Sequence, residues 1–370
     1  KLNWVIFLNV LVLAGAVLGH GDGYGQAVWQ PINYLAREGF NFHIICKGAT
    51  KEVLKHPYYG RRIHIYRVRY AGKPPIRTWS IVAFLRVLKI IRYNEIDVIH
   101  GHDPYSWFLS LFRNRVNKLM NIPYIVTAHA GGGDPYTWNK YIVNDPVFRQ
   151  YVKYRLRKLD LSKIMLAIGY DLDTLYSRIN FKGTDLVVTP TKSSIPIIHR
   201  YFSIPIKKIT VIPHGVNFKR FYKVYIMRSS RNPKSHYVSL TVGGSYVKGI
   251  SILIKAAEIV KRSLPVNFLI IGGMLDVPIV RNAIKKGLIK SLGYVEHSRI
   301  GKFYLNADIF VLPTYCEGFG LVLLEAMASG VPVVTTDAIG PRDIVRNGHD
   351  GIIVPRGDHK ALAEAIRRVL

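Results

Sequence analysis

Two carboxylates eight positions apart are the residues of this sequence with the clearest capacity for ligand chemistry. Glu317 precedes Gly318, Phe319 and Gly320, and Glu325 follows within an apolar stretch. If that stretch is helical, the carboxylates lie roughly 12 Å apart, at about 1.5 Å of rise per residue. Such a span suits a nucleotide sugar, with one carboxylate on ribose and the other, with free backbone amides, on the hexose.

The elements around these carboxylates are predicted by apolar runs and by Gly and Pro. Residues 308–313 read as a strand that ends at a proline, and a helix begins at about Phe319. Its apolar residues occupy every side, so we expect it to be buried. Gly330 and Pro332 end it, and a second buried strand covers 331–335. The alternative is structural, with Glu317 as a helix cap and Glu325 paired to a Lys or Arg.

A lysine in a glycine-containing loop is the predicted phosphate ligand. Lys248 lies between a strand that ends near Val242 and a helix that begins after Gly249. Backbone amides and a cation at a helix N-terminus suit a diphosphate. The alternative is an ordinary solvated lysine.

Histidines follow two strands of the N-terminal half. His129 precedes three glycines, and we expect it at the carboxyl edge of a parallel sheet, where ligands bind. His100, His102 and Asp103 form a polar cluster at another strand end, interpreted as lining a cleft, with a metal site as a weaker alternative. The pair Asp171 and Asp173 is predicted to be a solvated surface, because no strand precedes it.

Alternating strand and helix patterns predict a doubly wound α/β fold with two parallel-sheet domains, 1–220 and 221–370. A charged, Ser-rich segment at 228–234 is the expected linker. Residues 4–18 are interpreted as the first strand, with a signal sequence as the alternative. The glycine-rich loop that follows contains Gly23 and Gly25, and a helix is predicted over 26–38. The predicted strands cover 41–46, 63–68, 98–100, 124–127, 186–189, 237–242, 266–271 and 308–312.

Several of these motifs resemble retaining glycosyltransferases of family 4, which have the GT-B fold of two Rossmann-like domains. The C-terminal half carries the most specific likeness, from Gly293-Tyr294-Val295 through Glu317 and Glu325 to Gly330-Val331-Pro332. Weaker matches are Pro213-His214-Gly215 and the strand that leads to His129. The likeness covers nearly the whole chain.

The resemblance implies transfer of a hexose from a UDP-, GDP- or ADP-sugar with retention of configuration, without a cofactor or a required metal. It assigns catalytic roles to His129, Lys248 and Glu317. It places Gly23, Gly25, Val295, Glu325 and the amides of 318–320 at the donor. Two departures stand out: Gly244 and Ser245 occupy the region where many members carry an Arg, and the chain stops in a helix where the family usually continues.

Composition indicates an anionic partner. The chain has 370 residues, a net charge of +29 and 49% hydrophobic residues. Both halves are basic, with 28 Lys and Arg against 12 Asp and Glu in residues 1–205. Acidic lipid headgroups, phosphate-linked acceptors and nucleic acid are the candidate partners. Two cysteines, Cys46 and Cys316, without metal-type spacing, indicate the cytoplasm.

The acceptor is expected to be a glycan or a lipid-linked molecule. Residues 77–93 predict a helix with apolar and basic sides, which suits a peripheral position on an anionic membrane, or equally a helix that covers the sheet. No nucleic-acid-binding motif is evident, so no nucleic acid is expected. A sugar-nucleotide epimerase, a phosphorylase and a noncatalytic nucleic-acid-binding protein remain the alternatives.

Overall fold

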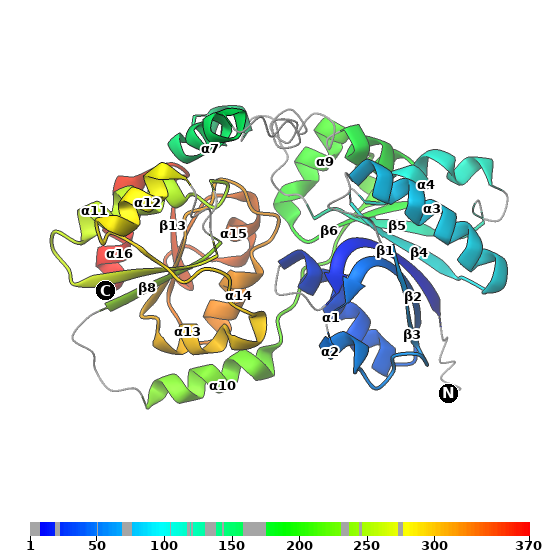
Figure 1. Ribbon diagram of the computed structural model, residues 1–370, viewed down its shortest axis with the longest axis horizontal. Helices are drawn as coiled ribbons and strands as arrows, with labels where there is room; N and C mark the ends of the chain where they lie inside the picture. Colours follow the sequence, from blue (N-terminus) through cyan, green and yellow to red (C-terminus); the bar gives the residue numbers. More distant parts are fainter. Residues whose placement is uncertain are drawn as a thin grey trace. The chain divides into compact units, whose positions relative to one another are not determined.

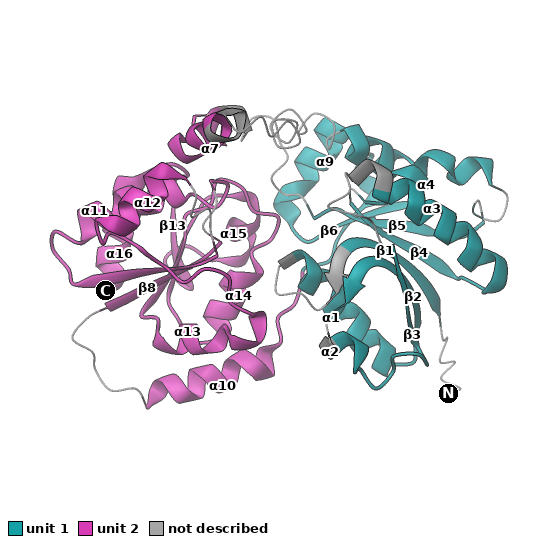
Figure 2. Cartoon of the chain, viewed as in Figure 1, with its two compact units in different colours: residues 1–129, 171–213 teal, residues 130–170, 214–370 magenta. Residues whose placement is uncertain are grey.

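The computed structural model describes residues 8–18, 23–49, 51–68, 76–103, 105–116, 119, 121–129, 138–142, 144–157, 175–230, 237–243, 246–272 and 277–370. The chain divides into two compact units (Figure 2). Unit 1 contains residues 1–129 and 171–213, and unit 2 contains 130–170 and 214–370.

Unit 1 is built on a parallel sheet of seven strands, in the order β3-β2-β1-β4-β5-β6-β7 (Figure 1). The order reverses between β1 and β4, which is where doubly wound sheets bind ligands at their carboxyl ends. The strands are β1 (Asn9–Leu18), β2 (Asn41–Ala49), β3 (Ile63–Arg67), β4 (Val98–His102), β5 (Tyr124–Thr127), β6 (Leu186–Thr189) and β7 (Ile209–Val211).

Helices cover both faces of this sheet, because its central strands are apolar on both sides. One face packs against α1 and α2, and the other against α3, α4 and α9. Trp79 of α3 is fully buried in the second layer. The helices are α1 (Gly23–Arg37), α2 (Lys51–Leu54), α3 (Ile76–Tyr93), α4 (Trp107–Phe112) and α9 (Ile195–Phe202), and residues 175–182 are also helical.

Unit 2 repeats this plan with six parallel strands in the order β10-β9-β8-β11-β12-β13. Its order reverses between β8 and β11, so the loops that follow these two strands flank the expected ligand position. The strands are β8 (Tyr237–Val242), β9 (Val266–Ile271), β10 (Lys290–Ser291), β11 (Ile309–Leu312), β12 (Val333–Thr336) and β13 (Gly351–Val354).

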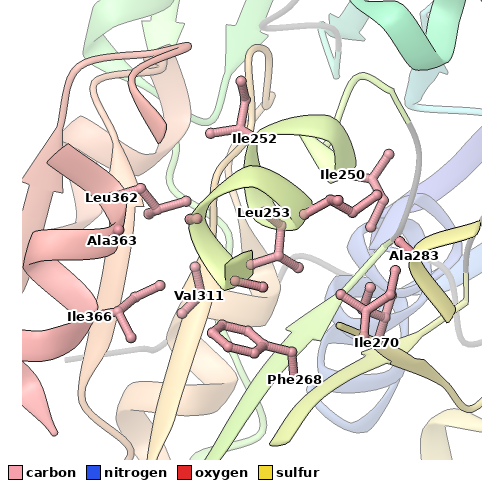
Figure 3. Close-up of a cluster of buried hydrophobic side chains, with 14 of the residues drawn as sticks. Ile250, Ile252, Leu253, Phe268, Ile270, Ala283, Val311, Leu362, Ala363 and Ile366 are labelled. Carbon is pink, nitrogen blue, oxygen red and sulfur yellow. The ribbon is translucent and has the colours of Figure 1, made fainter. Parts of the chain in front are cut away.

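Figure 3 shows the larger core layer of unit 2, where Leu253, Val311 of the sheet and Leu362 belong to one buried cluster. The opposite layer contains Phe221, Phe310 and Leu323. The helices are α7 (Pro146–Arg157), α10 (Phe218–Ser229), α11 (Ile250–Val260), α12 (Pro278–Lys285), α13 (Gly301–Asn306), α14 (Leu321–Ala328), α15 (Ile339–Ile344) and α16 (His359–Val369).

The predicted α/β fold with two parallel sheets is confirmed, and the expected strands form. The segment expected to be a linker is partly wrong: Arg228 and Ser229 belong to α10, and Arg228 donates a hydrogen bond to the Tyr304 carbonyl (2.8 Å). The first strand is confirmed over Asn9–Leu18. The first helix begins at Gly23, three residues before its expected start.

The domain division at residue 220 stays a prediction, but the contacts reveal two details that the pattern did not indicate. Helix α10 packs on α13 and α14 of unit 2, and the unit boundary by contacts lies at Pro213. Residues 138–157, from the first half of the sequence, also belong to unit 2. In the described part of the chain, no helix has the length and apolar character needed to cross a membrane.

Candidate donor-binding site

The loop between β8 and α11 presents Lys248 at the carboxyl edge of the unit 2 sheet. Helix α11 begins at Ile250, directly after Gly249, whose φ of 71° is left-handed. A side chain at Gly249 would strike the Pro313 carbonyl, so glycine lets this loop lie against the loop that follows β11. The expected strand–loop–helix context of Lys248 is therefore present.

Lys248 and Glu317, 69 positions apart in sequence, form an ion pair. The Lys248 Nζ donates to Glu317 Oε2, and the two side chains are 28% and 14% exposed. The two loops are joined nearby by backbone hydrogen bonding, since the Tyr315 N–H donates to the Val247 carbonyl (2.9 Å). An ammonium has three donors and can engage more than one acceptor at a time.

The turn after Glu317 leads into α14. Gly320 precedes the first helical residue with a φ of 108°, a conformation that side chains rarely adopt. Phe319 is buried, and its ring meets the edge of His214 at 5.3 Å between centroids. Burial lowers the pKa of His214 to about 4. Gly318 and Gly320 lie at the N-terminus of this eight-residue helix, as predicted. Backbone amides at a helix N-terminus favour anionic or hydroxyl ligands.

Glu325 is 5% exposed and lies inside α14, as the pattern predicted. Its two oxygens accept hydrogen bonds from His297 Nε2 (2.7 Å) and from the Tyr304 hydroxyl (3.0 Å). Burial and then the Glu325 carboxylate raise the pKa of Tyr304 well above its usual value. The partners are a histidine and a tyrosine, in place of the Lys or Arg of the structural alternative.

His297 is a site residue that the sequence analysis missed. Arg220 donates from its guanidinium to the His297 carbonyl, and Nη1 lies 3.3 Å from His297 Nδ1. His297 lies two residues after Val295, which is half-buried in the loop that follows β10. Its position near Val295, which is expected to border the nucleotide base, was the signal that the sequence offered. The pairing of His297 with Glu325 could not be predicted without the tertiary structure.

In unit 1, three imidazoles meet at the ends of β4 and β5. His102 Nδ1 lies 2.6 Å from His129 Nε2, and the two rings stack at 4.9 Å. His100 Nε2 lies 2.7 Å from Thr127 Oγ1, and burial lowers the pKa of His100 to about 4. The edge of Tyr24 meets the His129 ring at 4.7 Å. His129 therefore lies at the carboxyl edge of the sheet, as expected, and His102 is its unforeseen partner.

Some of the remaining predicted residues lie in the described part of the chain. Gly23 and Gly25 lie in the first turn of α1, and the loop at 19–22 is outside the described residues. Asp103 accepts hydrogen bonds from Ser177 (2.7 Å) and Asn180 (3.2 Å), which fits a structural role. No cluster of three or more metal-ligating side chains occurs among the residues described. Asp171 and Asp173 lie outside them, as do Gly244 and Ser245.

The arrangement in unit 2 has the chemistry of a phosphate and sugar site. One cation, one partly buried carboxylate and a helix N-terminus converge where the strand order reverses. A carboxylate accepts from sugar hydroxyls, while the cation and the amides attract phosphate oxygens.

Comparison with known proteins identifies the family. The chain matches the model of Glycosyltransferase Family 4 over residues 21–220 and that of Glycosyl transferases group 1 over residues 226–370. It is 27% identical over 324 residues to an uncharacterized glycosyltransferase of Methanocaldococcus jannaschii, covering 83% of this chain and 75% of the relative.

A second relative is the N,N'-diacetylbacillosaminyl-diphospho-undecaprenol alpha-1,3-N-acetylgalactosaminyltransferase of Campylobacter jejuni. It is 27% identical over 214 residues, which are 55% of each protein. The sucrose-phosphate synthase structure from Thermosynechococcus elongatus superimposes with a TM-score of 0.73 at 21% identity, covering 98% of this chain and 89% of that one.

The structural superposition shows the fold. The match to Glycosyltransferase Family 4, which covers more than half of the chain, shows the family. The protein belongs to glycosyltransferase family 4, as a group 1 glycosyltransferase with the GT-B fold.

Proposed function

We propose that this glycosyltransferase moves a hexose from a UDP-, GDP- or ADP-sugar to an acceptor hydroxyl and retains the anomeric configuration. The observation that carries the proposal is the Lys248–Glu317 pair beside the N-terminus of α14. A cation and free amides there would stabilise the negative charge that develops on the leaving diphosphate.

Each residue of the site has a role in this scheme. Lys248 binds the diphosphate, Glu317 and the amides of 318–320 hold the hexose, and Glu325 binds ribose. Val295 borders the base, Gly23 and Gly25 approach the donor phosphates or the acceptor, and His129 supports the reacting face of the sugar. Glu325 keeps this capacity alongside His297 and Tyr304, because each carboxylate oxygen has two lone pairs.

The chemical step is a front-side displacement. The acceptor oxygen forms a bond to the anomeric carbon as the bond from that carbon to the diphosphate oxygen breaks. The acceptor proton moves to the leaving phosphate oxygen, and attack on the face that the phosphate leaves preserves the configuration. Lys248 supplies a positive charge at the leaving group, so we propose that the reaction needs no metal ion.

Calorimetric titration with UDP-, GDP- and ADP-glucose and the matching mannose and N-acetylglucosamine donors tests this function. We expect one nucleotide to bind and Glu325→Ala to weaken it. Lys255→Met, on the exposed side of α11, serves as the unaffected control. NMR of the product would give the anomer, and activity retained in EDTA would support metal independence. Binding of no donor by the full chain would contradict the proposal.

The acceptor is proposed to be a glycan or a lipid-linked molecule at the cytoplasmic face of a membrane. The Campylobacter relative, whose name specifies a diphospho-undecaprenol substrate, supports a lipid-linked acceptor. The apolar side of α3 is buried in the unit 1 core, so only part of that helix suits lipid. Its exposed residues are Ile81, Leu85, Arg86, Lys89, Arg92 and Tyr93.

Helix α10 provides a comparison for this membrane proposal. It exposes Phe218, Tyr222 and Tyr225, whose rings stack in series, and it contains four basic residues and no acidic one. Sedimentation with vesicles of phosphatidylcholine, with and without phosphatidylglycerol, would test both helices through Leu85→Ser and Tyr222→Ser. Binding that does not depend on the anionic lipid would contradict the membrane proposal.

A further inference from the structure

Residues 138–142 and 144–157, here called the inserted segment, contribute to the core of unit 2 although they follow β5 in the chain. Ile142, Val147 and Phe148 are buried in the same hydrophobic cluster as Ile250 and Leu253 of α11. The Phe148 ring also meets Tyr246 at 4.9 Å. The inserted segment is therefore an integral part of the unit that carries Lys248 and Glu317.

A buried carboxylate fixes this segment. Asp145 is 2% exposed. Its Oδ1 accepts from the N–H groups of Val147 (2.8 Å) and Phe148 (3.1 Å), and so caps α7. Its Oδ2 accepts from the hydroxyls of Ser251 and Tyr315, the latter at 3.0 Å. Burial of a carboxylate is unfavourable unless its oxygens are hydrogen-bonded, and these four donors satisfy both oxygens.

The two hydroxyl partners lead directly to the donor site. Ser251 lies in the first turn of α11, three residues after Lys248, and Tyr315 lies two residues before Glu317. One carboxylate oxygen therefore contacts both loops that supply the ion pair. Because the two hydroxyls share this acceptor, a shift of Asp145 would change the spacing of the loops.

Aromatic contacts reinforce the same connection. The Tyr141 ring stacks on Tyr315 at 5.7 Å, and the Arg356 guanidinium lies 5.1 Å from the Tyr141 ring. Tyr151 approaches Tyr246, two residues before Lys248, at 6.0 Å. The inserted segment thus contacts both loops through its turn at Tyr141 and through α7.

We propose that the inserted segment is part of the donor-binding apparatus, and that Asp145 is a positioning residue that sets the geometry of Lys248 and Glu317 through Ser251 and Tyr315. This inference rests on the proposed donor function of that pair. Asp145 does not contact the donor in this scheme. It fixes the distance between a cation and a carboxylate that must engage the donor together.

The test uses the full chain and calorimetric titration with UDP, GDP and ADP. Asp145→Ala is expected to raise the Kd of the nucleotide that binds the wild type about tenfold. Tyr315→Phe, which removes one hydroxyl, should raise it less. Asp145→Asn should restore much of the affinity, because its amide oxygen can still cap α7 and its NH2 group can donate to the two hydroxyls.

Asp358→Ala is the matched control. Asp358 caps α16 through the N–H groups of Lys360 (3.0 Å) and Ala361 (2.9 Å), but it is exposed and its side chain bonds within α16. This substitution removes a comparable helix cap. It should lower the Tm and leave the Kd unchanged.

A double-mutant cycle separates positioning from stability. If Asp145 acts through Lys248, Asp145→Ala should have little effect on nucleotide affinity in a Lys248→Met background. Additive effects would overturn the inference, as would an unchanged Kd in Asp145→Ala or an equal increase in Asp358→Ala. If Asp145→Ala does not fold, Tyr315→Phe takes its place in the same double-mutant cycle with Lys248→Met, and the same outcomes support or overturn the inference. A wild type that binds none of the three nucleotides would overturn the donor function itself, and this inference with it.

Discussion

The carboxyl edges of the two sheets have the same topology but different chemistry. In unit 1 imidazoles and aromatic rings gather at this edge, together with Asp103 and with Lys47, whose Nζ lies 4.7 Å from the Tyr105 ring centroid, and burial keeps His100 neutral near pH 7. In unit 2 the edge carries a cation and two carboxylates. In the His102–His129 hydrogen bond one ring nitrogen must accept. At most one of the two rings can therefore be cationic while the bond persists. Unit 2 joins a cation to a carboxylate beside a helix N-terminus, a combination that suits phosphate.

The largest expected effect concerns the charge of unit 2. Lys248→Met should lower kcat/KM about 10²- to 10³-fold, because it removes the cation proposed to stabilise the leaving diphosphate. Lys255→Met, on the exposed face of α11, should change it little. Steady-state kinetics with the donor identified by titration would measure both. A loss below threefold for Lys248→Met would remove Lys248 from the catalytic scheme.

The two carboxylates of unit 2 should differ in their effect on stability. Glu325→Ala removes the acceptor of His297 and the nearer of the two acceptors of the buried Tyr304 hydroxyl, whose other acceptor is the Val322 carbonyl (3.3 Å), so we expect a loss of about 2–4 kcal/mol in the free energy of unfolding. Glu317→Gln affects a more exposed ion pair and should cost about 1 kcal/mol or less. Urea unfolding of both variants measures the difference. Equal losses would contradict a structural role specific to Glu325.

Acid should destabilise unit 1 through its buried histidines. Burial, and then the neighbouring His64, lower the pKa of His43 to about 4, against 6.5 in the unfolded chain. The unfolded state therefore binds more protons between these values. The stability that His43 contributes is complete above pH 6.5 and is lost as the pH falls to 4, by up to about 3 kcal/mol.

Urea unfolding at pH 7 and pH 4.5 measures this loss. His43→Gln should make the pH dependence shallower, whereas His349→Gln, at an exposed position of unit 2, should leave it unchanged. The same slope in wild type and His43→Gln would show that His43 does not titrate with a lowered pKa.

The smallest expected effect concerns the paired imidazoles of unit 1. His102→Phe keeps a ring beside His129 but removes the hydrogen bond that orients it. We expect kcat to fall about tenfold, or about 1.4 kcal/mol, with the Kd of the nucleotide unchanged. A weaker nucleotide affinity without a change in kcat would contradict the assignment of this edge to the reacting sugar.

Much of unit 2 could be predicted from local sequence. Strand β8 occupies the predicted residues 237–242, and β9 occupies 266–271. Apolar runs indicate the buried strands, and Gly and Pro indicate where the strands end. Both signals lie in neighbouring residues, so they can be read from the sequence. The apolar residues on every side of α14 likewise predicted a buried helix, with Glu325 as its exception, and Gly330 adopts a φ of 67° after its end.

Helix α3 shows where local pattern was insufficient. Its sequence fitted a membrane surface and a sheet-covering helix equally well, and its burial in the unit 1 core came from packing against β1 and β2. The role of α10 was missed for a similar reason. Its charged and Ser-containing end resembles a linker, but Arg228 binds carbonyl groups of the α13 region.

The sequence by itself determined the parallel α/β architecture, the family, and the identity of the residues at the strand ends. Periodicity and local motifs carry these properties, since both depend on residues near one another in the chain. Tertiary structure alone decided that Lys248 meets Glu317, that His297 and Tyr304 share Glu325, that His102 orients His129, and that Asp145 connects the inserted segment to unit 2. These contacts join residues 21 to 170 positions apart, and the crossover connections of the two parallel sheets bring such positions together.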